Sequence, residues 1–141
     1  LARTVERIQR VTGASQVDIV SHSMGGIVAA HYINNIGSAG TVRRLVTLGT
    51  PWRGTKVHIF GIGRQSHALA TDSAEIARAL PVAAPVTAVW SKTDAIILPT
   101  AHATFEGAEA VELENQGHNA MLFSLETMRA VEAALSRGGE E

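Results

Sequence analysis

Residues 17–26, Val-Asp-Ile-Val-Ser-His-Ser-Met-Gly-Gly, constrain the fold of this chain more than any other stretch. The first four residues favour a strand, and the apolar run at 27–33 that follows almost at once favours a helix. Strand, sharp turn and helix together form the context that a nucleophile elbow requires. Such a turn exposes the hydroxyl of Ser23 at the head of the strand and aims the Met24 amide at the helix N-terminus, where it can stabilise an oxyanion.

A turn this tight demands small residues two places before and after the serine. Gly25 meets this demand fully, and Ser21 meets it approximately. The run Ser-His-Ser-Met-Gly-Gly after an apolar strand resembles the elbow of the α/β-hydrolase superfamily, particularly its bacterial lipases and esterases. The usual pattern there is Gly-x-Ser-x-Gly, so Ser21 is a small-for-small exchange. The alternative is a glycine-rich helix start with an incidental serine.

Further strands are expected wherever β-branched and apolar residues run together between turn residues. They cover residues 42–48, 86–91 and 108–113. Helices are expected at residues 2–11, at 24–36 with Gly37 as a left-handed C-cap, and at 119–136. Strands that alternate with helices predict an α/β fold: three α/β/α layers around an open, mostly parallel sheet, a partial α/β-hydrolase fold.

The length of 141 residues indicates a single domain over 1–141. Twelve Lys and Arg residues against thirteen Asp and Glu residues give no attraction to nucleic acid. No apolar run approaches the ~20 residues that a transmembrane helix needs, and no signal peptide opens the chain. These features predict a soluble protein and leave a secreted or cytoplasmic location open.

Because Leu1 is not an initiator methionine, we expect the domain to be incomplete at its N-terminus. The first strand would then leave a sheet edge uncovered, through which the chain could self-associate or pair with another chain. The insertion at residues 56–85 is longer than ordinary connections and is expected to form a cap or lid over the site.

Three residues with the chemistry of a serine hydrolase follow separate predicted strands: Ser23, Asp94 and His118. The carboxyl ends of parallel strands meet at one edge of a sheet, so these side chains should lie together. Their order, serine then acid then histidine, is that of α/β-hydrolases. His118 would take the proton of Ser23, and Asp94 would orient and stabilise the imidazole. Taken singly, Asp94 also suits an ordinary turn and His118 an ordinary loop position.

The oxyanion site is expected to be half represented in this chain. Met24 supplies one N–H, whereas in the resembling family the second donor follows a strand N-terminal to residue 1. Three alternatives stay open: a weakened enzyme, an enzyme completed by another chain, or a fragment.

The remaining histidines give no reason to expect a metal or cofactor. His31, His58, His67 and His102 lack paired ligand spacing. Alternation along the strand sends His22 to the side opposite the nucleophile, so packing is its expected role.

Four apolar residues in loops near the predicted site are candidates to receive an acyl chain: Trp52, Phe60, Ile96 and Ile97. Core packing explains each of them equally well. The sequence therefore predicts a lipase- or esterase-type serine hydrolase acting on a small-molecule ester or lipid. An acyltransferase with the same triad, or a non-catalytic remnant that binds a partner, are the alternatives.

Overall fold

The structure is a computed structural model, and it describes residues 1–56 and 74–137. The strands are β1 (Val17–His22), β2 (Val42–Leu48), β3 (Val86–Ser91) and β4 (Glu109–Leu113). The helices are α1 (Ala2–Thr12), α2 (Gly25–Asn35), α4 (Ala74–Ala77) and α5 (Leu125–Ser136), with 3₁₀ turns η1 (Thr100–Ala103) and η2 (Ala120–Leu122).

The four strands form one sheet in the order β1-β2-β3-β4, and every neighbouring pair is parallel. The register aligns the strand ends, because His22 pairs with Leu48 and Leu48 pairs with Val89. Ser91 at the end of β3 pairs with Leu113 at the end of β4. The loops that follow the strands therefore leave from one edge of the sheet.

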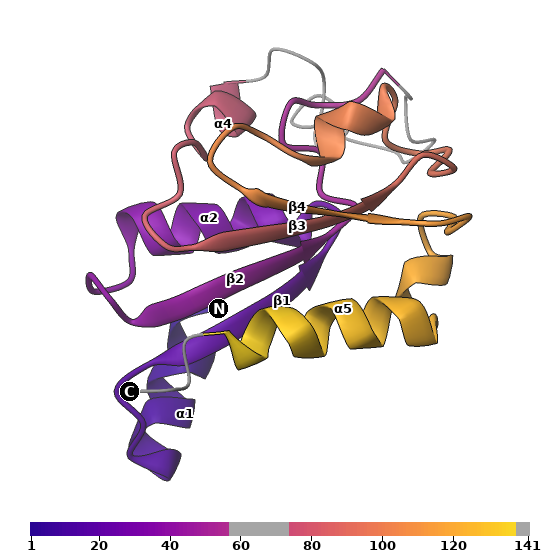
Figure 1. The fold of residues 1–141 in the computed structure, drawn as a ribbon. Coiled ribbons are helices and arrows are strands. Elements are labelled where there is room, and N and C mark those ends of the chain that lie inside the picture. The colour runs from indigo at the N-terminus through magenta and orange to yellow at the C-terminus, as the bar shows by residue number, and fades with distance from the viewer. Residues whose placement is uncertain (57–73, 138–141) are drawn as a thin grey trace.

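Helices cover both faces of the sheet, which confirms the predicted three-layer α/β/α fold with an open parallel sheet (Figure 1). Leu45 of β2 packs with the apolar residues of α2 and α4 on one face. The next residue, Val46, packs with Met121 and Ala134 on the opposite face, beneath α5. This alternation along one buried strand supports two separate apolar layers.

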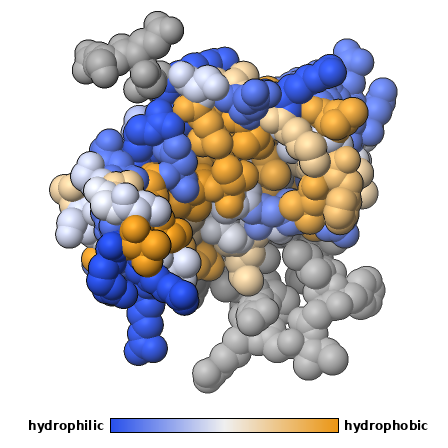
Figure 2. Space-filling model, turned by 90° about the horizontal axis from the view of Figure 1, so that it is seen from below, coloured by the Kyte–Doolittle hydropathy of each residue, from blue (hydrophilic) through white to orange (hydrophobic). Residues whose placement is uncertain are grey.

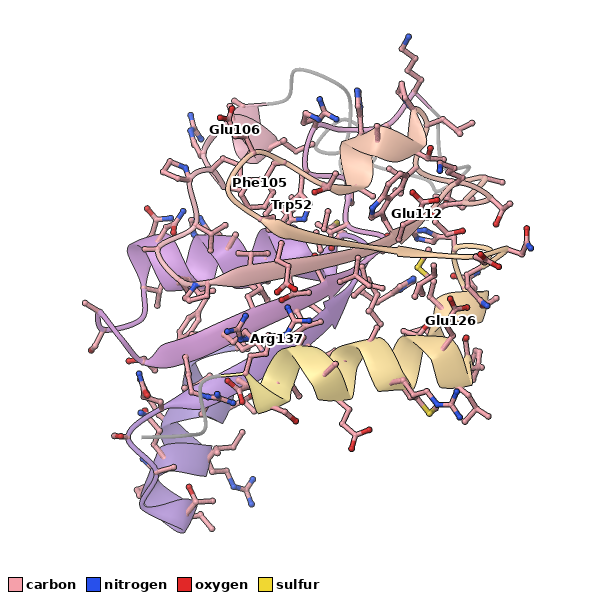
Figure 3. All side chains as sticks on the ribbon, in the orientation of Figure 1. Trp52, Phe105, Glu106, Glu112, Glu126 and Arg137 are labelled. Carbon is pink, nitrogen blue, oxygen red and sulfur yellow. The ribbon has the colours of Figure 1, made fainter. Side chains whose placement is uncertain are left out.

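Ion pairs at the amino-terminal edge of the sheet fasten the C-terminal end of α5. Arg43 donates to Asp18 at 2.5 Å and to the Leu135 carbonyl at 2.9 Å. Arg137 pairs with Glu109 at the first residue of β4, and Figure 3 shows Arg137 at the opposite end of α5 from Glu126.

Two predicted helix boundaries are wrong. The expected helix at 119–136 is divided into η2 and α5, because Ser124 adopts an extended conformation and caps α5 by accepting from the Thr127 amide. Helix α2 ends at Ile36, and Gly37 is not left-handed. A side chain at position 37 would lie 3.0 Å from the ring of Tyr32, which is why this position suits a glycine.

Strand β1 lies at the edge of the sheet, and the face that it shares with α5 is partly open. A groove of about 570 Å³ runs there between Val20, Leu48, Met121, Met128 and Leu135. Figure 2 shows apolar side chains gathered on this side of the molecule. Self-association through this edge stays a prediction, which sedimentation of the chain at several concentrations would test.

The predicted lid falls mostly on residues 57–73, which lie outside the described residues. At its C-terminal end, Ile76 and Ala79 belong to the apolar core next to α2. Within residues 1–56 and 74–137, no helix is long and apolar enough to cross a lipid bilayer.

Candidate active site

Ser23 stands in a strained backbone conformation between β1 and α2. Its φ of 54° is left-handed, a conformation that costs a residue other than glycine about 1–3 kcal/mol and persists only where the surroundings enforce it. Two hydrogen bonds enforce it here. The Ser23 amide donates to the Leu48 carbonyl at 2.9 Å, and the hydroxyl of the buried Thr50 donates to the Ser23 carbonyl at 2.8 Å. The local geometry is the strand, sharp turn and helix that a nucleophile elbow requires.

Asp94 and His118 form a buried hydrogen-bonded pair just beyond the ends of β3 and β4. Asp94 Oδ2 and His118 Nδ1 lie 2.8 Å apart, and the two residues are 3% and 8% exposed. The other carboxylate oxygen, Oδ1, accepts from the amides of Ile96 at 2.8 Å and Ile97 at 3.0 Å. The Asp94 side chain is thus fixed at both oxygens, as the orienting acid of a catalytic triad is.

Hydrogen bonds keep the Asp94 carboxylate charged despite its burial. Burial acts to raise the pKa of Asp94, but hydrogen bonds from the His118 ring and from the Ile97 and Ile96 amides outweigh it, and the pKa lies below its ordinary value. An ionised carboxylate only accepts hydrogen bonds, so the proton between the two groups belongs to His118 Nδ1. Nε2 of the neutral imidazole is then the basic nitrogen.

Gly49 brings the serine next to this pair. It follows Leu48, whose carbonyl holds the Ser23 amide, and its own amide donates to the Val89 carbonyl of β3. A side chain built on Gly49 would lie 3.1 Å from both Asp94 Oδ2 and His118 Nδ1. Ser23 and the Asp94–His118 pair therefore approach each other across a single backbone position, although Ser23 Oγ forms no hydrogen bond with the residues that the structure describes.

Comparison with known proteins places this geometry in a family context. A model of the PGAP1-like alpha/beta domain matches residues 1–68, which contain β1, Ser23, α2 and β2. Among solved structures, lipase BlEst2 of Bacillus licheniformis superposes with a TM-score of 0.73 at 14% identity, over 95% of this chain and 71% of that one. The chain has the α/β-hydrolase fold. The resemblance read from residues 21–26 is confirmed.

Other structures agree with this fold. A gene product of Listeria innocua has a TM-score of 0.69 at 18% identity, over 96% of this chain and 64% of that one. A carboxylesterase of Nitrososphaera gargenis has a TM-score of 0.65 at 13% identity, over 95% of this chain and 70% of that one. The chain thus spans about two thirds of the length of these α/β-hydrolase-fold structures.

The Met24 amide, the expected oxyanion donor, begins the turn into α2. The Gly26 amide donates to the Ser23 carbonyl at 3.1 Å, and the Ile27 amide donates to the Met24 carbonyl at 3.1 Å. No residue within the described part of the chain accepts a hydrogen bond from the Met24 amide. It is available to a ligand at the positive end of the helix dipole.

The glycine that this elbow needs most is Gly26. The sequence assigned the steric demand to Gly25, but a Cβ there would meet only Ser21 Cβ, at an ordinary 3.6 Å. A Cβ on Gly26 would lie 2.3 Å from Thr50 Oγ1 and 2.6 Å from its Cγ2. The tight approach is therefore between α2 and the loop after β2.

The four predicted substrate contacts do not share one environment. Trp52 is fully buried, donates from Nε1 to Thr47 Oγ1 at 3.3 Å and packs edge-on against Phe105 (Figure 3). Ile97 is also fully buried, so neither presents surface to a ligand in this structure. Ile96 is partly exposed, and Phe60 lies outside the described residues.

Three residues at the site carry roles that the sequence analysis did not assign: Gly49, Thr50 and His22. Gly49 and Thr50 stand in the Leu-Gly-Thr-Pro run directly after β2, and that position at a strand end was the available signal. His22 had no such signal, since it reaches His118, 96 residues away in the chain.

Replacement of Gly49 by alanine is expected to displace the Asp94–His118 pair. The Gly13→Ala variant is the matched control, because Gly13 is also left-handed, with φ of 72°, but has no neighbour within 4 Å. Gly49→Ala should lower the free energy of unfolding by about 1–3 kcal/mol more than Gly13→Ala does. Urea unfolding measures this difference, and equal losses in the two variants would contradict the close contact.

Proposed function

We propose that this chain is a serine hydrolase that cleaves carboxylic esters with an apolar acyl group through Ser23, His118 and Asp94. The observation that carries the proposal is the buried Asp94–His118 pair, packed against Gly49 beside the strained Ser23. The names of the fold neighbours, lipase and carboxylesterase, support the same class of reaction.

The reaction begins with attack of Ser23 Oγ on the ester carbonyl carbon while His118 Nε2 takes the hydroxyl proton. The carbonyl oxygen becomes an oxyanion, to which the Met24 amide donates. Ionised Asp94 stabilises the imidazolium that forms. When the C–O bond to the alcohol breaks, His118 returns the proton to the departing alcohol and the acyl group stays on Ser23.

Water then repeats the sequence on the acyl-enzyme. His118 takes a proton from water, the resulting hydroxide attacks the acyl carbon, and the same proton goes to Ser23 Oγ as the carboxylic acid leaves. The hydrogen bond between Ser23 and His118 need not be formed beforehand, because such contacts often tighten only when substrate binds.

Apolar side chains close to the site in sequence favour an apolar acyl group. Leu98 follows Asp94 and is 40% exposed, and Leu122 and Phe123 follow His118 and are 44% and 80% exposed. Exposed apolar residues in one region commonly mark a binding surface.

Covalent labelling tests the proposal directly. A fluorophosphonate should attach to one serine of the native chain, and mass spectrometry of the digest should locate it at Ser23. Ser38→Ala is the matched control, since Ser38 is exposed at the far end of α2. Labelling should survive Ser38→Ala and vanish in Ser23→Ala. Equal labelling of the native chain and Ser23→Ala would reject the proposal.

A further inference from the structure

His22, the residue before Ser23, makes two contacts with His118. Alternation along β1 directs its side chain to the α5 face, the face from which the loop carrying His118 arrives. Its Nε2 lies 3.0 Å from the His118 carbonyl oxygen. The two imidazole rings have centroids 4.6 Å apart and planes inclined by 48°. The expectation that His22 lies away from the site and only packs is therefore wrong.

The chemistry of the contact sets the protonation of His22. A carbonyl oxygen only accepts hydrogen bonds, so His22 Nε2 must carry a proton and donate it. Burial lowers the pKa of His22, and the nearby His118 ring lowers it further, against the opposing effects of the carbonyl contact and of Asp94. His22 is then neutral at neutral pH, and no second positive charge opposes protonation of His118.

The other anchors of this loop hold residues before His118. The Gln116 amide donates to Ser91 Oγ at 3.2 Å, and the Glu114 amide donates to Glu126 at 3.3 Å. At His118 itself, Asp94 holds the ring and His22 holds the carbonyl. Two fixed points on one residue, its backbone and its ring nitrogen, together restrict where Nε2 points.

We propose that His22 is a positioning residue for His118: as the neutral Nε2–H tautomer it donates to the His118 carbonyl and, with Asp94, fixes the imidazole toward Ser23. The role in turnover rests on the proposed function, whereas the orienting contact does not. A misplacement of about 1 Å costs up to ~10²-fold in rate, so the contact should matter to kcat.

Two substitutions separate the donor from the ring. His22→Gln keeps an N–H donor on a neutral side chain of similar reach, and His22→Phe keeps a ring without the donor. We expect His22→Phe to lower kcat for a p-nitrophenyl ester by on the order of 10-fold with KM unchanged. His22→Gln should restore most of the loss. His31→Phe is the control, because His31 is exposed on α2.

A second readout does not depend on activity. The His118 Nδ1 proton, held between two buried groups, should give a far-downfield proton NMR signal in the native chain and in His22→Gln. It should broaden or shift in His22→Phe at a temperature where urea unfolding shows that variant to be folded. If no variant hydrolyses esters but the signal follows this pattern, the proposed function fails and the positioning contact stands.

Three results would overturn the proposal. One is an unchanged kcat and NMR signal in His22→Phe. Another is a loss in His22→Gln as large as that in His22→Phe, which would make the ring rather than its donor responsible. The third is a fall in the free energy of unfolding for His22→Phe with the His118 signal unaltered, which would make His22 a packing residue.

Discussion

Replacement of Asp94 by asparagine is expected to lower ester turnover by about 10⁴-fold while the chain stays folded at neutral pH. The introduced amide can still accept from the Ile96 and Ile97 amides through Oδ1, so the loop after β3 keeps its anchor. Its NH₂ group then faces His118 Nδ1 and donates to it. That contact moves the imidazole proton to Nε2, which can no longer take the proton of Ser23.

The matched control is Asp18→Asn. Asp18 is also a hydrogen-bonded carboxylate, but it pairs with Arg43 at the other end of the sheet. Its replacement should leave kcat within a factor of about two of the native value. Steady-state kinetics with a p-nitrophenyl ester measures both variants, and turnover of Asp94→Asn within about tenfold of the native value would refute the orienting role of Asp94.

Acid titration should reveal the same carboxylate. The pKa of Asp94 lies below its ordinary value of 3.8, so the unfolded chain binds a proton more readily than the folded chain near that pH. The stabilisation is therefore complete above about pH 5 and is lost as pH falls through the folded-state pKa. The stability gap between the native chain and Asp94→Asn should narrow below about pH 4, as urea unfolding at several pH values would show.

Replacement of Gly26 by alanine is expected to destabilise the fold by about 3 kcal/mol or more, at the upper end of overpacking costs. The added Cβ would overlap Thr50 Oγ1 at 2.3 Å, and Thr50 is fully buried. Thr50 cannot withdraw without releasing the Ser23 carbonyl that it holds at 2.8 Å. Stability and fluorophosphonate labelling of Ser23 should therefore fall together.

Gly25→Ala is the matched control for this effect. Its Cβ meets nothing closer than 3.6 Å, and alanine is a better helix former than glycine by about 1 kcal/mol. Gly25→Ala should thus match or exceed the native urea midpoint. Thr50→Ala should partly rescue Gly26→Ala, because it removes the two closest atoms, and the double variant should lose less than the sum of the single ones. Equal midpoints for Gly25→Ala and Gly26→Ala would contradict the contact.

The elements of the fold could be predicted because they depend on local pattern. Residues 17–26 determine a strand, a turn and a helix start within ten positions, and Ser23 has the left-handed φ that such a turn imposes. The parallel order of four strands followed from their alternation with helices and loops. Boundaries were harder, since the break at Ser124 depends on a side-chain cap that competes with helix continuation.

The sequence alone determined which residue types stand at the carboxyl ends of β1, β3 and β4, because a parallel sheet brings those ends to one edge whatever its other details. Tertiary structure alone decided which residues touch there. The burial of Trp52, the approach of Gly26 to Thr50 and the contact of His22 with the His118 carbonyl each join segments distant in the chain. Such contacts depend on distances of a few tenths of an ångström between packed elements, which no periodicity of residues encodes.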